Sequence, residues 1–175
     1  GTSTTLSDNT GNFHTSCVYV SGNDVYVGGY RTPTASIVSR AVIWKNGVAQ
    51  YLNSGQFNSI VRKILVVGSD VYAVGQDNVG GNGTGRAVIW KNGVATYLTD
   101  GIGSDAMAND IFIDGTDVYV CGRKSSGGSG EFAQLWKNGV ATVLSASGSN
   151  GIAQSVFVKN GDVYVTEAGL MGGPV

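Results

Sequence analysis

Residues 87–98 read AVIWKNGVATYL, and this stretch decides the fold of the chain. Two runs with the pattern of β-strands flank the pair Asn92-Gly93. An Asn-Gly pair tolerates the two positive φ angles of a type I′ turn, so it is the strongest short signal for a β-hairpin. The stretch therefore predicts two antiparallel strands joined by a two-residue turn.

The hairpin recurs along the chain at a constant spacing. The phrase Trp-Lys-Asn-Gly is repeated every 46 residues, beginning at Trp44, Trp90 and Trp136. A second phrase, Asp-Val-Tyr, keeps nearly the same period and begins at Asp24, Asp70, Asp117 and Asp162. Two phrases with one period indicate an internal repeat, and a repeat of this length determines the architecture of the whole chain.

Each repeat unit has the pattern of four short strands. An apolar run such as Ile64-Leu65-Val66 forms the first strand, Asp-Val-Tyr opens the second, and the hairpin supplies the third and fourth. Four antiparallel strands in about 40–50 residues are typical of a β-propeller blade. A stacked β-solenoid is the alternative, although its repeats are usually shorter and lack regular Asn-Gly hairpins. We therefore predict an all-β chain, a β-propeller of four-stranded antiparallel blades.

The repeat also predicts how the chain is divided. We expect a single domain, 1–175, with units at approximately 14–59, 60–106, 107–151 and 152–175, and an additional strand at 2–6. The last unit lacks the strand that carries Trp, so we expect three and a half to four blades, whereas closed propellers have about four to eight. The remainder of the ring is expected to come from a longer protein or from further copies of the chain.

Composition supports a folded β-domain and argues against several functional classes. The chain contains 28 glycines, only 13% charged residues and a net charge of −1. Such a surface has little attraction for nucleic acid or anionic lipid, so we expect neither partner. No apolar run is long enough for a membrane-spanning helix, and residues 1–15 lack the pattern of a signal peptide.

The units resemble the propeller repeats of secreted or surface-exposed bacterial proteins, which are built around phrases of the DVYV and WKNG type. The first unit is also loosely similar to a kelch blade, because Val27-Gly28-Gly29-Tyr30 matches its strand-Gly-Gly start. The Gly pair is confined to that unit, and the Gly-His and Trp-Asp marks of WD40 blades are absent. The resemblance implies a non-enzymatic protein-interaction or scaffold module, extracellular or at the cell surface.

The lengths of the connections predict which face binds. Within a unit, the turns from strand one to two and from three to four are short, whereas the other connections are longer. In an up-and-down blade these two sets lie on opposite faces, and function usually lies on loops held by a rigid scaffold. We therefore expect the long-loop face to bind a protein partner or further parts of the propeller, with a carbohydrate as the alternative ligand.

Candidate ligand-binding residues lie where the units differ. The first strands open with polar residues that change from unit to unit, and two loop aromatics do not repeat. Arg62 and Lys63 suit a polar or anionic ligand, and the alternative is that the strand residues are solvated at the mouth of a central channel. The candidates are Arg62, Lys63, Asn109, Asp110, Gln154, Tyr30 and Phe57.

Residues that repeat are interpreted as parts of the frame. Asp24 and its equivalents are expected to accept hydrogen bonds from turn backbone. Trp44 and its equivalents are expected to pack between blades, with a sugar-stacking platform as the alternative. We also expect the tyrosines of Asp-Val-Tyr to be core or inter-blade residues, at Tyr26, Tyr72, Tyr119 and Tyr164.

No catalytic, metal or cofactor motif was found, so we predict no enzymatic activity, no cofactor and no metal site. A propeller hydrolase or lyase is the less favoured alternative. Cys17 and Cys121 lie two units apart, beyond the disulfide range of about 7 Å. His14 is the only His, and no Gly-x-Ser-x-Gly motif supplies a nucleophile for it. Residues 77–82 match a calcium loop weakly, without the Glu at its twelfth position.

Overall fold

The chain is an all-β molecule, seen in a computed structural model that describes residues 3, 5–6, 11–53, 55–78, 84–125, 130–145 and 150–170. Every regular element within these ranges is a β-strand, so the all-β prediction is confirmed. The same ranges contain no helix that would be long and apolar enough to cross a membrane.

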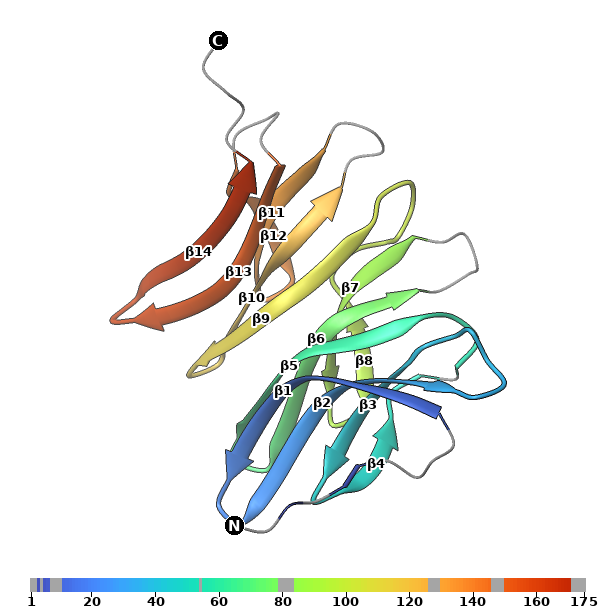
Figure 1. Cartoon of the computed structure of the whole chain (residues 1–175). Helices are drawn as coiled ribbons and strands as arrows, with labels where there is room; N and C mark the ends of the chain where they lie inside the picture. Colours follow the sequence, from blue (N-terminus) through green and yellow to red (C-terminus); the bar gives the residue numbers. More distant parts are fainter. Residues whose placement is uncertain are drawn as a thin grey trace.

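The strands form four antiparallel sheets that follow the repeat (Figure 1). Three sheets have four strands paired in chain order, and the last has two strands. We name the sheets units 1 to 4. Unit 1 contains β1 (Gly11–Ser21), β2 (Asp24–Pro33), β3 (Arg40–Lys45) and β4 (Val48–Tyr51). Unit 2 contains β5 (Ser59–Val67), β6 (Asp70–Asn78), β7 (Gly85–Lys91) and β8 (Val94–Tyr97).

The other two sheets continue the same pattern. Unit 3 contains β9 (Ala106–Asp114), β10 (Asp117–Ser125), β11 (Glu131–Lys137) and β12 (Val140–Val143). Unit 4 contains β13 (Asn150–Lys159) and β14 (Asp162–Leu170). The predicted additional strand at 2–6 lies partly outside the described residues, and the described Ser3, Thr5 and Leu6 belong to no strand.

The Asn-Gly pairs form the predicted turns. Asn46, Asn92 and Asn138 each have a φ angle of 51°, and the glycines that follow them have φ angles of 82–85°. Two positive φ angles are what a type I′ turn requires. The third and fourth strands therefore pair as expected, for example with Trp90 opposite Ala95 in unit 2.

Each first strand carries a β-bulge at the same position. The extra residue in β1, β5, β9 and β13 is Ser16, Arg62, Asn109 and Gln154, respectively. A bulge leaves one residue outside the hydrogen-bond ladder and increases the local twist. In units 1 to 3 a glycine faces the bulge, and a Cβ atom on Gly29, Gly75 or Gly122 would collide with a carbonyl oxygen of the first strand.

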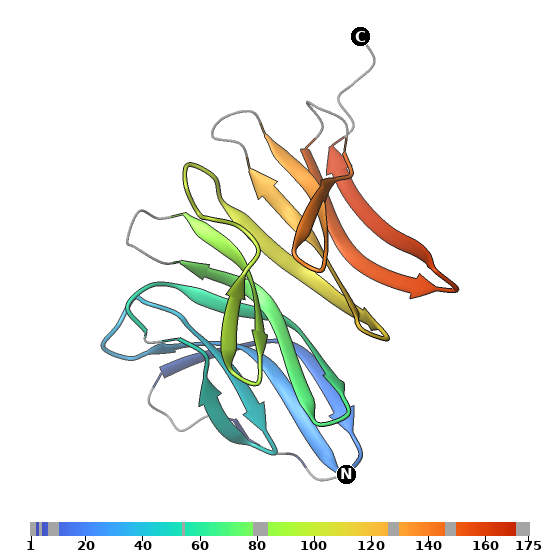
Figure 2. The same ribbon diagram turned by 180° about the vertical axis from the view of Figure 1, so that it is seen from behind.

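The four sheets lie face to face in a fan, with their first strands adjacent (Figures 1 and 2). β1 contacts β5, β5 contacts β9, and β9 contacts β13. The hydrophobic core is divided into three clusters between consecutive sheets, around Trp90, Trp136 and Val156. The prediction of packing between blades is confirmed for Trp90 and Trp136, which lie in these clusters, and Trp44 is buried rather than part of an exposed platform.

The first and last sheets expose surfaces that are buried in the units between them. Val18 of unit 1 is 66% exposed, whereas its equivalents Ile64, Ile111 and Val156 are 1%, 3% and 4% exposed. At the other end, Tyr164 is 56% exposed, against 4% for Tyr119. Tyr164 is therefore not a core residue of the four sheets, because no sheet among the described residues packs beyond β14.

The connections lie on two opposite faces, as the predicted strand order requires. The short turns within the hairpins β1–β2 and β3–β4, and their equivalents, form the tight-turn face. The connections β2–β3 and β4–β5, and their equivalents, lie at the opposite ends of the strands and form the long-loop face (Figure 1).

Candidate functional site

Repeated residues build the tight-turn face. The Asp24 carboxylate accepts a hydrogen bond from Asn46 Nδ2 (2.8 Å) and forms an ion pair with Lys45 Nζ (2.7 Å). Asn46 Oδ1 in turn accepts a hydrogen bond from the backbone N–H of Val25 (2.8 Å). The expectation that the Asp binds turn backbone is therefore wrong in detail, because the Asn makes that bond and the Asp holds the Asn.

The same arrangement is present around Asp70 and Asp117. The neighbouring Lys and Asn side chains hold the pKa of Asp24, Asp70 and Asp117 below its usual range. In each of the three units, these contacts join two turns of one sheet. The groups are largely exposed to solvent and nearly identical from unit to unit. They therefore act as a frame rather than as a ligand site.

Three of the predicted site residues come together on the first strands. Asp110 is buried, and its Oδ2 accepts hydrogen bonds from Ser155 Oγ (2.6 Å) and the Val156 N–H (3.1 Å). Its Oδ1 lies 3.6 Å from Lys63 Nζ. Asn109 donates from Nδ2 to the carbonyl of Ala153 (2.9 Å). Both carboxylate oxygens of Asp110 are thus occupied in joining units 2, 3 and 4.

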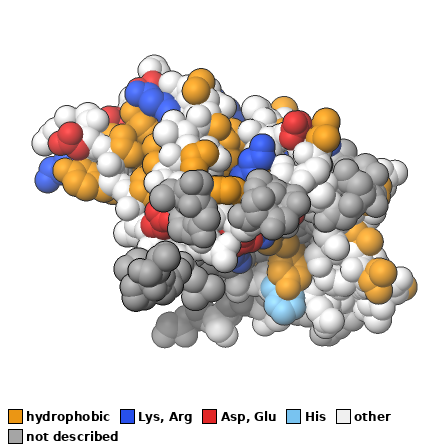
Figure 3. Space-filling view, turned by 90° about the horizontal axis from the view of Figure 1, so that it is seen from above, with side chains coloured by type: hydrophobic (Ala, Val, Ile, Leu, Met, Phe, Trp, Pro, Cys, Tyr) orange, Lys and Arg blue, Asp and Glu red, His pale blue; other side chains and the backbone are white. Residues whose placement is uncertain are grey.

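The remaining predicted residues lie apart from this row. Arg62 and Gln154 are exposed bulge residues. Tyr30 belongs to β2 and not to a loop, because that strand extends to Pro33, and its ring stacks on His14 with 4.6 Å between ring centroids. His14 is visible at the surface as the pale blue side chain in Figure 3. Phe57 lies between units 1 and 2, where its carbonyl accepts a hydrogen bond from Asn53 Nδ2 (3.2 Å).

A small cavity of about 200 Å³ lies between the outer strands of units 1 and 2, and Phe57 lines it. Its polar centre is Asp77, which accepts hydrogen bonds from the hydroxyl of Tyr97 (2.8 Å) and from Asn53 Nδ2 (3.4 Å). Burial raises the pKa of Asp77, and burial together with Asp77 raises the pKa of Tyr97 to about 12. These bonds join units 1 and 2 across the cavity, and Asn53 Oδ1 and Asn78 Oδ1, which belong to residues of the same lining, are buried without a hydrogen-bond partner.

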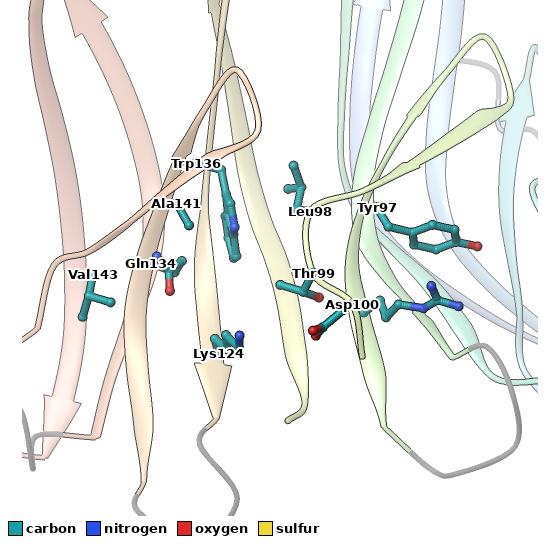
Figure 4. Close-up of a pocket in the computed structure, with 10 residues that line it drawn as sticks. Tyr97, Leu98, Thr99, Asp100, Lys124, Gln134, Trp136, Ala141 and Val143 are labelled. Carbon is teal, nitrogen blue, oxygen red and sulfur yellow. The ribbon is translucent and has the colours of Figure 1, made fainter. Parts of the chain in front are cut away.

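A larger cavity of about 690 Å³ lies at the equivalent place between units 2 and 3, and we name it the 2–3 cavity. Val143 stands at the position of Tyr97, and Lys124 at the position of Asp77. Leu98, Thr99 and Asp100 lie on one wall, and Lys124, Gln134 and Trp136 on the other (Figure 4). The lining is completed by Arg86, Tyr97, Ala141 and Val143.

The 2–3 cavity contains polar groups without partners. Gln134 is only 4% exposed, yet its side-chain amide forms no hydrogen bond with any residue that the structure describes. Trp136 Nε1 is also buried without a hydrogen-bond partner. Both groups belong to residues that line the cavity, so they are available to hydrogen-bond a polar molecule there. Sequence reasoning missed the cavity because it compared the first strands, whereas the signal is the change from Tyr97 to Val143 in the fourth.

The described residues contain no cluster of side chains that is suited to metal binding or to disulfide formation. No group of three or more His, Cys, Asp and Glu side chains is placed there to hold a metal ion. Cys17 and Cys121 are free thiols, as predicted, and burial with nearby Asp110 raises the pKa of Cys121 to about 12. Most of the weak calcium-loop match at 77–82 lies outside the described residues.

No protein-family model matches the chain, and no curated protein matches it either.

Proposed function

We propose that the chain forms a β-propeller, or a portion of one, and serves as a non-enzymatic interaction module that binds a protein partner through its long-loop face. The observation that carries the proposal is the contrast between the two faces. One Asp–Lys–Asn arrangement is repeated three times on the tight-turn face. The long-loop face differs from unit to unit. A repeated frame with one variable face suits binding, and the repeat resemblance supports a site outside a bacterial cell.

The end surfaces support a propeller that continues beyond the four sheets. Every internal junction places the surface that carries Tyr19 or its equivalent against the surface that carries Ile64 or its equivalent. The first sheet exposes Val18 and Val20, and the last exposes Phe157 and Tyr164. These are the two halves of the same kind of junction. A further blade, from a longer chain or another copy, would bury both apolar surfaces.

Exposed apolar residues support the long-loop face as the binding surface. Ile37 is 95% exposed in the β2–β3 connection, and Ile102 is 78% exposed in the β8–β9 connection. Neither belongs to the repeated frame. Large apolar side chains at the centre of an interface contribute much of the binding energy, whereas isolated ones on a surface contribute nothing to folding.

The test locates binding on one face. Arrays of extracellular-matrix and bacterial surface proteins are probed with the chain, and each hit is measured again after a polyethylene glycol maleimide is attached to a new cysteine. Ile102→Cys places the polymer on the long-loop face, and Val48→Cys places it on the tight-turn face. We expect the polymer at residue 102 to weaken binding about tenfold or more and the polymer at residue 48 to change it little. Equal effects at both positions, or no hit on the protein arrays, would contradict the proposal.

Carbohydrate binding is the second candidate, because the 2–3 cavity has a buried amide without a partner at Gln134. A glycan array separates the two functions. Hits on glycans that persist with the polymer at residue 48, in the absence of any protein hit, favour the second candidate over the first.

A further inference from the structure

We propose that the 2–3 cavity binds an acidic sugar, meaning a sugar ring that carries a carboxylate. This inference rests on the second proposed function, carbohydrate binding, and specifies both its site and its ligand class.

The 2–3 cavity departs from the repeat in size and lining. In the 1–2 cavity, the ring of Tyr97 fills the space and its hydroxyl bonds Asp77. In the 2–3 cavity, Val143 is too short to fill that space, and Lys124 replaces the acid. The volume therefore rises from about 200 to about 690 Å³. The larger value lies within the range of about 300–1,000 Å³ that is typical of small-molecule sites.

Hydrogen-bonding groups line the walls of the 2–3 cavity. The Gln134 amide offers donors and an acceptor, and Trp136 Nε1–H offers a donor. The Thr99 hydroxyl accepts a bond from the Ala87 N–H (3.1 Å) and keeps its own proton to donate. Trp90 Nε1 also lacks a partner, but Trp90 lines neither of the two cavities. Neutral donors and acceptors of this kind match the hydroxyl groups of a sugar.

The walls of the 2–3 cavity also carry charged side chains. Lys124 forms no ion pair with any described residue, and Arg86 lies over the Tyr97 ring with its guanidinium carbon 4.2 Å from the centroid. The single acid is Asp100, which accepts a hydrogen bond from the Ile102 N–H (3.2 Å). Arg86 also acts on the Asp77 carboxylate of the 1–2 cavity, where it opposes the rise in pKa, so Lys124 is the cation of the lining that has no partner among the described residues. Leu98, Ala141 and Val143 add apolar surface, so the matching ligand has an apolar ring face, hydroxyl groups and a negative charge.

The test follows the three indole N–H signals by NMR in the isotopically labelled chain, with Trp136→Phe used to assign the relevant one. The probe is a short oligogalacturonate, and a neutral galacto-oligosaccharide of the same length is the matched control. We expect the acidic probe to move the Trp136 signal and to leave the Trp44 and Trp90 signals unchanged. We expect the neutral control to bind at least about tenfold more weakly than the acidic probe.

Two variants and one control make the assignment specific. Val143→Tyr rebuilds the side chain that fills the equivalent cavity, and Lys124→Ala removes the unpaired cation. We expect each to weaken binding of the acidic probe about tenfold or more. Lys137→Ala, on the tight-turn face, should change the affinity less than about twofold. A thermal melt of each variant checks that it folds.

The outcomes separate this inference from the function on which it rests. If the glycan array gives hits but no acidic sugar moves the Trp136 signal, carbohydrate binding stands and the assignment of the site falls. If neutral and acidic probes bind equally, or an acidic peptide binds more tightly than the acidic sugar, the ligand class is wrong. If no glycan binds, both are wrong.

Discussion

The cavities between units 1 and 2 and between units 2 and 3 occupy equivalent places on the same frame. In the first, Tyr97, Asp77 and Asn53 bond one another across the junction. In the second, Val143 and Lys124 leave a space more than three times as large. The comparison shows that a repeat can keep its strands, turns and Trp positions while two differing residues enlarge the cavity between neighbouring units.

The largest effect is expected from the Trp residues at the two junctions. Trp90→Ala should destabilise the fold by about 3–5 kcal/mol, because a large buried side chain leaves a cavity behind. Trp136→Ala should cost less, because the ring already borders an open cavity. Denaturation by urea measures both values, and an equal or greater loss at Trp136 would break the comparison.

The next effect concerns the side chains that differ between the cavities. Asp77→Ala removes the acceptor of Tyr97 and Asn53 and should cost about 1–3 kcal/mol. Lys124→Ala removes a side chain that no described residue pairs with, and should cost less than about 0.5 kcal/mol. Urea denaturation curves of the two variants test the difference. Similar losses would mean that Lys124 supports the fold and that the 2–3 cavity is not a free site.

A smaller effect is the titration of Tyr97. Its raised pKa, about 12, means that the phenol stays neutral in the folded chain at pH values where an unfolded Tyr ionises. The folded state then holds more protons, so its contribution to stability is full below about pH 10 and is lost as the pH rises toward 12. The absorbance of phenolate against pH measures this, with Tyr97→Phe as the control. A wild-type curve that lacks a component near pH 12 would contradict the prediction. So would a component near pH 12 that persists in Tyr97→Phe.

The smallest effect is expected on the tight-turn face, where the units are alike. The pKa of Asp24, Asp70 and Asp117 is lowered, so their ion pairs contribute stability above the usual Asp pKa of about 4 and lose it as the pH falls through the lowered value. Asp70→Ala and Asp117→Ala should lower the melting temperature slightly and equally, and salt should reduce both effects. Unequal effects at neutral pH would mean that the frame differs between units after all.

The frame was predictable from sequence because its determinants are local. Asn92-Gly93 sets a turn whatever lies around it, and a period of 46 residues brings Trp90 and Trp136 to equivalent places. The burial of these rings followed directly. The tyrosine of unit 4 was the exception, since the exposure of Tyr164 depends on a neighbouring sheet and not on its own phrase.

The candidate site was not predictable in the same way. The 2–3 cavity depends on Val143 at the end of β12, Lys124 at the end of β10, and Thr99 after β8 of another unit. Their equivalence to the residues of the 1–2 cavity becomes visible once strand pairing fixes which positions face one another. Polar residues on the first strands, such as Asp110, stood out in the sequence, but the fold uses that carboxylate to join units.

The exposed ends described above also bear on how the molecule behaves at high concentration. A contact between the Phe157 surface of one molecule and the Val18 surface of another is heterologous, because different patches meet. Such a contact gives a closed ring if the rotation from unit to unit completes a circle, and otherwise an open filament that grows with concentration. Val18→Lys would then act as a chain stopper that caps growth at one end and leaves every internal junction unchanged.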